Sequence, residues 1–424
     1  MSNSTGHGNG DGPGGRRRRS ALATVVFGAL LVVLSAGVVA FLMQAVGPLE
    51  TAPEAATEQA EEPTMRVVTA REYFEGSGKR EVLPGVPSVA PSTPWLKLDQ
   101  SMTLTRIGVG SCLGQNQPQP IWEGVLRLEP RPQLFMMIGD SVYGDIKSPA
   151  AKELVQAYRD QAARPELAKA RQAMPFIAMW DDHDYGRNDA GGNFSQKGNA
   201  ARLFHDFWQM EPERPVENGI YYARTYGSEG RRVQIIMLDT RSMRSEFQRK
   251  SDSFKHWGKF EPIEDPERTM LGNAQWEWLE ERFQEPADVR IIVSSIQLLA
   301  EGHGFERWGN LPLERQRFFN LINDTGARGV ILLSGDRHSG AFYSGKLANG
   351  QTLAEMTTSS LNRSYAPPQD ARTPERLSQM YNQENFGLVD IDWRQRKIEL
   401  LLKDIDGETL DGITVKFADL GIDE

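Results

Sequence analysis

The chain has 424 residues, and its 48 basic and 57 acidic side chains give a formal net charge of −9. This acidic balance argues against a protein that binds nucleic acid over a broad basic face. The hydrophobic content of 39% allows one large domain or two smaller ones, and a single cysteine, Cys112, excludes a disulfide within the chain.

The N-terminal residues predict a membrane anchor. Residues 1–20 are rich in Gly and end in four arginines, whereas residues 21–47 carry no charged side chain. This apolar segment exceeds the ~20 residues that span a bilayer as a helix, and it is longer than the apolar core of most cleaved signal peptides. Because basic residues flank the cytoplasmic end of a span, we expect residues 1–20 to be a flexible cytoplasmic tail and residues 21–47 a single transmembrane helix.

The remainder of the chain is then expected outside the cytoplasm, in a periplasm or on the cell surface. A cleaved secretory signal is the alternative. Residues 48–100 begin with a stretch rich in Pro, Ala, Glu and Thr that lacks apolar periodicity, which predicts an extracytoplasmic linker. Residues 101–424 are predicted to form the folded domain.

Short apolar runs and helical patterns alternate along this domain, which predicts an α/β fold with a parallel or mixed sheet. The near-unbroken runs indicate strands that are buried on both faces. The C-terminal residues 385–393 and 397–417 predict antiparallel strands that close a second sheet. The apolar runs lie within residues 104–112, 133–145, 175–186, 233–242, 289–297 and 329–340, and the helices within residues 149–172, 198–210, 273–285 and 312–324.

Five of the apolar runs end in residues that can bind metals. A single Asp after a strand is usually a turn or capping residue. However, ligands in open α/β sheets bind at the carboxyl ends of the strands, and several carboxylates in one cleft would repel each other without a cation. The pattern therefore predicts a metal centre rich in oxygen ligands. The residues are Cys112, then Asp140, Tyr143 and Asp145, then Asp181, Asp182 and His183, then Asp239, and finally Asp336 and His338.

Cys112 has three possible roles at this stage: a small buried apolar residue, a nucleophile or a metal ligand. Among the histidines, His183 and His338 lie within the carboxylate motifs, whereas the role of His303 is left open.

The motifs GSC, GDSVYGD, WDDHDYG and GDRHSG occur in this order, and together they resemble the alkaline phosphatase D (PhoD-like) family of metallophosphoesterases. LDTR and the later ERWGN fit as well, and the resemblance covers residues 104–393. It implies an α/β/β/α sandwich of two mixed sheets with a metal cluster at the sheet edge. It also implies hydrolysis of phosphate monoesters and diesters outside the cytoplasm, through hydroxide activated by metal.

The resemblance also assigns ligands for Fe³⁺ and Ca²⁺. It implies that Cys112 and Tyr143 bind iron as thiolate and phenolate and that Asp140 bridges two metals. Asp182 is implied to bind the second metal. Asp336 and His338 occupy the last metal-binding motif.

Three positions depart from the family pattern or leave a role open. Asp184 stands where some relatives have Glu, and either Asn188 or Asp189 is expected to supply a further polar ligand. Gln297 lies near the place of a motif His that this chain lacks.

The catalytic residues expected from the resemblance are His183, which protonates the leaving oxygen, and Arg241, which contacts the phosphate. Arg187 and Arg337 are further candidates for the phosphate contact, and pairing with a ligand carboxylate is the alternative for each arginine. The expected partners are a phosphoester substrate and, through residues 21–47, a membrane. No nucleic-acid-binding surface is evident, and the sequence does not identify protein partners. Alternative functions are a phosphodiesterase for an envelope polymer or nucleotide, and a membrane-tethered binding protein that has lost catalysis.

Overall fold

The computed structural model describes residues 81–251, 258–365, 370 and 372–422. The predicted cytoplasmic tail, the predicted transmembrane helix and most of the predicted linker lie outside the described residues. Within the described ranges, no helix combines the length and the apolar character that a membrane span requires.

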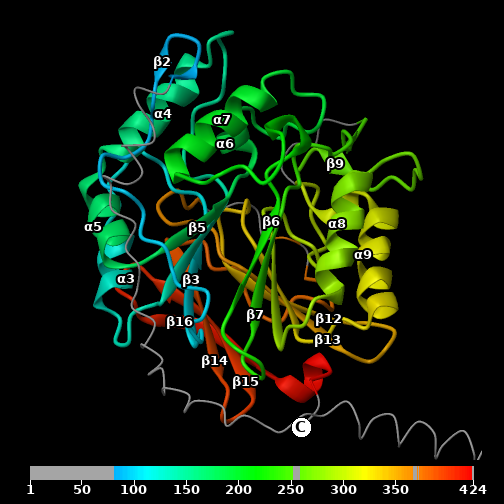
Figure 1. Ribbon diagram of the computed structural model, residues 1–424. Helices are drawn as coiled ribbons and strands as arrows, with labels where there is room; N and C mark the ends of the chain where they lie inside the picture. Colours follow the sequence, from blue (N-terminus) through cyan, green and yellow to red (C-terminus); the bar gives the residue numbers. More distant parts are fainter. Residues whose placement is uncertain (1–80, 252–257, 366–369, 371, 423–424) are drawn as a thin grey trace, which may run out of the picture. The chain divides into compact units, whose positions relative to one another are not determined.

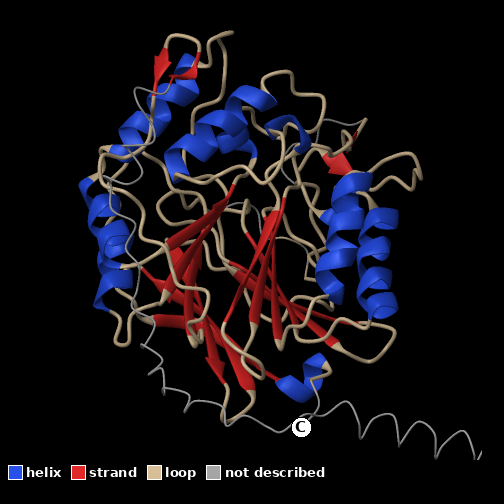
Figure 2. Ribbon diagram, viewed as in Figure 1, coloured by secondary structure: helices blue, strands red, loops and turns tan. Residues whose placement is uncertain are grey.

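Two six-stranded mixed sheets form the centre of the fold (Figures 1 and 2). In spatial order, the first sheet contains β12 (Ala341–Lys346), β13 (Thr352–Thr357), β11 (Val330–Ser334), β10 (Val289–Ser294), β7 (Val233–Leu238) and β6 (Tyr222–Tyr226). The second sheet contains β16 (Thr409–Lys416), β15 (Lys397–Asp404), β14 (Asn385–Asp392), β3 (Arg106–Gly110), β4 (Leu134–Ile138) and β5 (Phe176–Met179). Two short hairpins pair β1 (Glu81–Leu83) with β2 (Val86–Pro87) and β8 (Gln248–Arg249) with β9 (Phe260–Glu261).

Each sheet combines parallel and antiparallel strands. Strands β7, β10, β11 and β13 run parallel in the first sheet, and β3, β4 and β5 run parallel in the second. The predicted C-terminal strands are β14, β15 and β16, which are antiparallel and extend the sheet that contains β3. The α/β class with two mixed sheets is thus confirmed.

Helices cover the outer faces of both sheets. In Figure 1, α8 and α9 lie on one side of the strands, while α3, α4 and α5 lie on the other. The helices are α3 (Ile121–Arg127), α4 (Lys152–Ala162), α5 (Pro165–Ala173), α6 (Asp182–Tyr185), α7 (Lys197–Trp208), α8 (Asn273–Gln284) and α9 (Pro312–Thr325).

Strands β7, β10 and β11 of the first sheet are buried on both faces, which explains their unbroken apolar runs. In β7, Val233, Ile235 and Met237 join the larger apolar cluster, which also contains residues of the second sheet. The alternating Ile236 and Leu238 join the cluster formed with α8 and α9. Because successive strand residues face opposite sides, the first sheet lies between the helices and the second sheet. The layers therefore follow the order helix, sheet, sheet, helix.

The folded part begins earlier than the predicted boundary at residue 101. Leu83, Val89 and Trp95 are buried. The backbone N–H of Val89 donates to the Asp206 carboxylate over 2.6 Å, and the indole of Trp95 donates to the carbonyl of Phe207 over 2.8 Å. Residues 81–100 therefore pack on α7. The linker predicted at residues 48–100 is too long at its C-terminal end, because the buried apolar residues of this segment form no periodic pattern in the sequence.

Candidate metal centre

The turns that follow β3, β4 and β11 meet at the carboxyl ends of the parallel strands. Four residues in them have left-handed backbone conformations: Cys112 (φ 58°), Asp140 (φ 51°), Asp336 (φ 64°) and His338 (φ 52°). Residues other than Gly rarely adopt this region, and such strain concentrates at functional sites where the surrounding fold enforces it. The fold thus imposes an unfavourable backbone at four of the predicted ligands.

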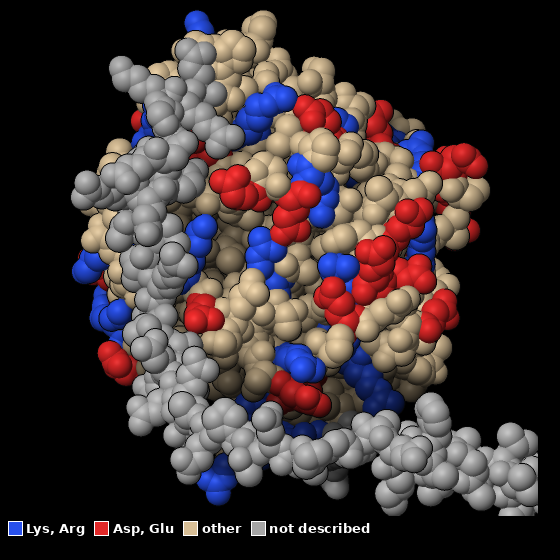
Figure 3. Space-filling view, in the orientation of Figure 1, with Lys and Arg blue, Asp and Glu red and all other residues tan. Residues whose placement is uncertain are grey.

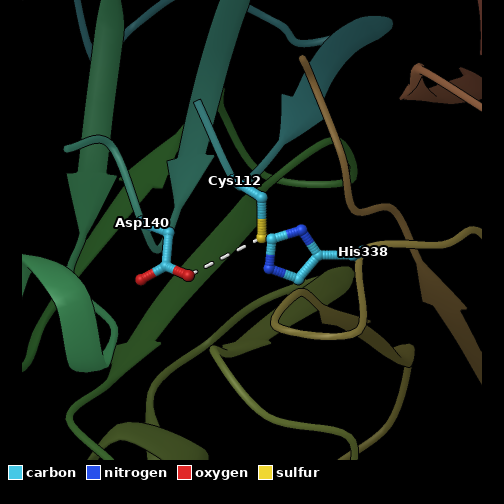
Figure 4. Close-up of side chains that lie close together, drawn as sticks. All are labelled: Cys112, Asp140 and His338. Atoms are coloured by element: carbon cyan, nitrogen blue, oxygen red, sulfur yellow. Dashed lines mark hydrogen bonds between the residues drawn. The ribbon is translucent and has the colours of Figure 1, made fainter. Parts of the chain in front are cut away.

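Three of these side chains point toward one another. Potential ligand atoms of Cys112, Asp140 and His338 all lie within 4.8 Å of one another (Figure 4). Cys112 Sγ is 3.7 Å from Asp140 Oδ2, and the hydroxyl of Tyr143 is 3.3 Å from the same oxygen. One thiol, one phenol, one carboxylate and one imidazole therefore surround a single point.

Further groups of potential ligands adjoin this point. Asp140 also groups with Asp182 and His183, and Asp182 groups with Asp181 and Asp336. Asp140 and Asp182 are each shared between neighbouring groups, which is the arrangement that bridging ligands require. The structure thus brings all six predicted metal ligands to one place.

The buried carboxylates of this centre are only partly compensated within the described chain. Burial raises the pKa of Asp182, but the charges of His183 and Arg241 outweigh burial and lower it. Asp182 Oδ2 accepts the backbone N–H of Asp189 over 2.6 Å, whereas the buried Oδ1 has no hydrogen-bond partner among the described residues. Burial, and secondarily the charge of Asp182, raises the pKa of Asp140 well above its usual range. Buried carboxylates without donors are costly, and a cation removes that cost. The donor set therefore fits one or more bound metal ions.

Cys112 is fully buried, yet it also faces the metal centre. Its sulfur lies 3.0 Å from the hydroxyl of Ser359. Burial raises the pKa of the thiol to about 11, so a thiolate would need a nearby cation. Burial alone does not explain why this thiol is placed beside Asp140 and His338.

His183 is held at the border between two cavities. Its Nδ1 is 2.6 Å from Asp145 Oδ1, and its backbone N–H donates to Asp140 Oδ1 over 3.2 Å. Burial lowers the pKa of His183, but Asp182, Asp140 and Asp145 outweigh burial and raise it to about 10. The residue lines a cavity of about 620 Å³ that contains the carboxylates and a shallower one of about 750 Å³ beside Tyr143.

Arg241 lies behind the 620 Å³ cavity rather than in its lining. Its side chain is fully buried, with Nε 2.6 Å from Asp181 Oδ1 and Nη1 2.6 Å from Glu306 Oε2. Glu306 also accepts a bond from Arg244 over 2.8 Å. Arg241 therefore pairs with carboxylates, which is the alternative role expected from the sequence. Its guanidinium group is not exposed for the predicted phosphate contact.

The other two candidate arginines also have partners. Arg337 lines the 620 Å³ cavity, but it pairs with Asp370 over 2.8 Å and lies 4.4 Å from the centre of the Phe305 ring. Arg187 lies over the ring of Phe194 and is not part of that lining.

Asp239 does not join the cavity, contrary to the expectation that all five strand ends would meet there. It is fully buried. Its oxygens accept bonds from the indole of Trp180, the hydroxyl of Ser242 and the backbone N–H groups of Ile220, Arg241 and Ser242. These five donors make Asp239 a structural residue of the turn after β7.

The remaining open positions take different roles. Asn188 and Asp189 both line the 620 Å³ cavity, and the Asp189 carboxylate pairs with Lys259. Asp184 instead ties two turns together, accepting bonds from the backbone and hydroxyl of Ser141 over 3.0 and 2.5 Å. Gln297 forms hydrogen bonds with Thr357 and His303, and none of these three residues lines the 620 Å³ cavity.

The sequence patterns assigned no role to Glu306 or to the basic residues of the β8–β9 hairpin. Glu306 can group with Asp182 and Asp189 around a metal, and it lines the cavity. It follows a long loop after β10 rather than a strand end, so the strand-end rule could not find it. In the sequence, only the motif ERWGN, which contains Glu306 and fits the family pattern, indicated this segment.

The fold and the clustered ligands define a two-sheet α/β protein with a candidate multi-metal centre. Residues 109–401 match the PhoD-like phosphatase family, and the chain belongs to that family. It is 25% identical over 249 residues to alkaline phosphatase D of Bacillus subtilis (strain 168), covering 49% of this chain and 41% of the Bacillus protein. The alignment thus spans less than half of that relative.

Two solved structures share the fold. The structure of PhoD superposes with a TM-score of 0.57 and 14% identity, covering 76% of this chain and 70% of that chain. GAP50, the anchor in the inner membrane complex of Plasmodium, superposes with a TM-score of 0.50 and 13% identity, covering 74% of this chain and 90% of that chain. At these identities the superpositions establish the fold alone.

Proposed function

We propose that this chain is a metal-dependent phosphoesterase that hydrolyses phosphate monoesters, diesters or both. The observation that carries the proposal is the buried oxygen of Asp182, which has no hydrogen-bond partner among the described residues and lies within a cluster of potential ligands from several turns. Membership of the PhoD-like phosphatase family and the matching fold support it. The intact ligand set favours an enzyme over a binding protein that has lost catalysis.

We assign the metals by the chemistry of the side chains. Cys112 and Tyr143 would hold Fe³⁺, because anionic sulfur and phenolate donors suit a ferric ion. Asp182 and Asp336 offer the oxygen ligands that Ca²⁺ prefers, with Asp140 placed between the two groups. When bound, the metals would lower the pKa of a coordinated water and neutralise charge on the phosphate oxygens.

The chain itself would then orient the substrate and move a proton. Asp145 fixes the imidazole of His183 through the 2.6 Å contact at Nδ1. His183 lines both cavities, so an ester bond lying between them would place its leaving oxygen near the imidazole. We propose that His183 protonates this oxygen, a contribution of roughly 10²–10⁴-fold when the group is positioned.

The test combines metal analysis, spectroscopy and kinetics on the purified chain. We expect stoichiometric iron and calcium, a visible charge-transfer band from tyrosinate and iron, and hydrolysis of 4-nitrophenyl phosphate and bis(4-nitrophenyl) phosphate. Asp140→Ala should lose metal and activity, whereas Asp324→Ala, which removes an exposed carboxylate on α9, should keep both. Equal rates for Asp140→Ala and the unmodified chain would refute the site.

Comparing the two ester rates also addresses the alternative function. A strong preference for the diester would favour an enzyme specialised for an envelope polymer or a nucleotide. A chain that binds metal but hydrolyses neither ester would support the catalytically inactive binding protein.

We also propose that residues 21–47 anchor the protein in a membrane, with the folded domain outside the cytoplasm. The support is the uncharged segment that follows four arginines. In intact cells, a protease added outside should digest the domain, and carbonate extraction should leave the chain in the membrane fraction. Release by carbonate would contradict the anchor, and protection from protease would contradict the orientation.

A further inference from the structure

We propose that Arg249 and Lys250, at the end of β8, form a binding site for a second anionic group of the substrate, such as a phosphate that is not cleaved. This inference rests on the proposed function and deepens it. The two residues line the 620 Å³ cavity that also contains Asp140, Asp182 and Asp336. They belong to the β8–β9 hairpin and not to the strand-end turns that hold the metal centre. In Figure 1, β9 and α6 lie at the same end of the central strands.

Their charges are available to a ligand. Lys259, the third basic residue of the hairpin in this cavity, already pairs with Asp189. Within the described part of the chain, Arg249 and Lys250 have no carboxylate partner, and Arg249 lies 5.6 Å from the centre of the Phe260 ring. Two unpaired cations beside a cavity favour an anion there, particularly once metal ions have neutralised the carboxylates.

The hairpin is attached firmly enough to position these charges. The rings of Phe247 and Phe260 are buried and lie 5.4 Å apart. The backbone N–H of Phe260 donates to the carbonyl of Gly304 over 2.7 Å, just before the segment that carries Glu306. At Gly258 a Cβ would lie 2.0 Å from the carbonyl carbon of Gly304, so the two backbones approach closely. The hairpin is thus joined to a wall of the same cavity.

The location separates this anion site from the scissile phosphate. The scissile group would lie against the metal centre on the strand-end turns, whereas Arg249 and Lys250 extend from a separate element. A cavity of about 620 Å³ falls in the range that holds a whole small-molecule ligand rather than a single phosphate group. On the face shown in Figure 3, basic and acidic side chains are interspersed among uncharged ones, so neither sign of charge dominates that face.

The test uses two matched substrates that differ by one phosphate. They are thymidine 5′-(4-nitrophenyl phosphate) and its 3′-phosphorylated form, assayed with the metal-loaded full-length chain by release of nitrophenolate. We expect the additional phosphate to lower KM about three- to tenfold, because two exposed charge contacts each contribute modestly. The advantage should diminish as ionic strength rises.

The variant Arg249→Gln/Lys250→Gln should reduce the ratio of the two KM values to near one. The matched control Arg231→Gln/Lys346→Gln removes the same charge from exposed positions outside the cavity and should keep the ratio of the unmodified chain. A ratio unchanged by Arg249→Gln/Lys250→Gln, or no preference in the unmodified chain, would overturn the inference. Failure to release nitrophenolate from either substrate, together with no hydrolysis of 4-nitrophenyl phosphate, would instead overturn the proposed function.

Binding measured without turnover keeps the two questions apart. By calorimetry, thymidine 3′,5′-bisphosphate should bind more tightly than thymidine 5′-monophosphate, and only the hairpin variant should remove that difference. Equal affinity of the unmodified chain for both nucleotides would contradict the second anion site, whatever the catalytic result.

Discussion

The turns after β5 and β7 each contain a buried aspartate, but the two carboxylates differ in their surroundings. Asp239, after β7, accepts hydrogen bonds from five donors of the chain. Asp182, after β5, accepts one backbone hydrogen bond at Oδ2, while its Oδ1 has no hydrogen-bond partner in the described part of the chain. Both follow an apolar strand, so the sequence pattern alone does not distinguish them. The two aspartates differ in the number of hydrogen-bond donors that contact each carboxylate.

This difference separates stability from function. A buried carboxylate with a full set of donors stabilises its turn, and removing it leaves those donors unsatisfied. A buried carboxylate oxygen without a donor keeps part of its charge uncompensated in the metal-free fold, and a bound cation supplies that compensation. We therefore expect Asp239 to matter for folding and Asp182 to matter for metal binding.

The largest effect is expected for Asp182→Asn, which removes the unpaired charge with little change in volume. Activity toward 4-nitrophenyl phosphate should fall about a hundredfold or more, with loss of bound metal by elemental analysis. The metal-free variant should melt near the temperature of the metal-free unmodified chain, because the repulsion with Asp140 that is removed offsets the lost attraction to His183 and Arg241. A metal-free variant that melts well below it would remove the distinction from Asp239.

The reverse result is expected for Asp239→Asn. The amide cannot accept bonds from all five donors, so the free energy of unfolding should fall by about 3 kcal/mol. Chemical denaturation of the metal-free protein measures this loss. At temperatures where the variant remains folded, its metal content should equal that of the unmodified chain. Selective loss of metal without loss of stability would show that Asp239 belongs to the centre after all.

The sequence predicted the fold well because burial on both faces leaves a strong local signal. The apolar runs that contain β7 and β10 show it, with neighbouring residues such as Ile235 and Ile236 in different apolar clusters. The start of the fold was harder to predict. Trp95 is buried by distant contacts with α7, and no local pattern marks it.

The candidate site was predictable only where its residues follow strands. Asp140 and Asp336 do so, and the structure places both in groups of potential ligands. Arg241 also follows a strand, but its role depends on Asp181 and Glu306, which are far away in sequence. Whether a charged residue faces the cavity depends on the residues that pair with it in the folded protein. The spacing of motifs in the sequence does not reveal these partners.

An intermediate effect is expected for Gly139→Ala, which perturbs the turn between β4 and Asp140. Gly139 has φ 122°, and a Cβ there would lie 2.6 Å from the Cβ of Asp181. The substitution combines backbone strain with a steric overlap, so it should cost about 2 kcal/mol of unfolding free energy. Because it displaces both Asp140 and Asp181, it should also weaken metal binding, unlike Asp239→Asn. Metal titration of the two variants at matched stability tests this, and equal affinities would contradict it.

The smallest effect concerns pH and a buried titratable group remote from both aspartates. His205 on α7 is 8% exposed, and burial lowers its pKa from 6.5 to about 4. Between these values the unfolded chain binds a proton that the folded chain does not, so this contribution to stability is complete above pH 6.5 and is lost as pH falls toward 4. At pH 5 the loss is about 1–2 kcal/mol.

The variant His205→Gln removes this titration and leaves that of the carboxylates in place. Denaturant unfolding of the metal-free chains at pH 7.5 and pH 5 should therefore show a smaller decrease for the variant than for the unmodified chain. The comparison uses each protein's own change with pH, so any constant cost of the substitution cancels. Parallel pH curves for the two chains would show that His205 titrates normally and that the acid sensitivity of the fold arises elsewhere.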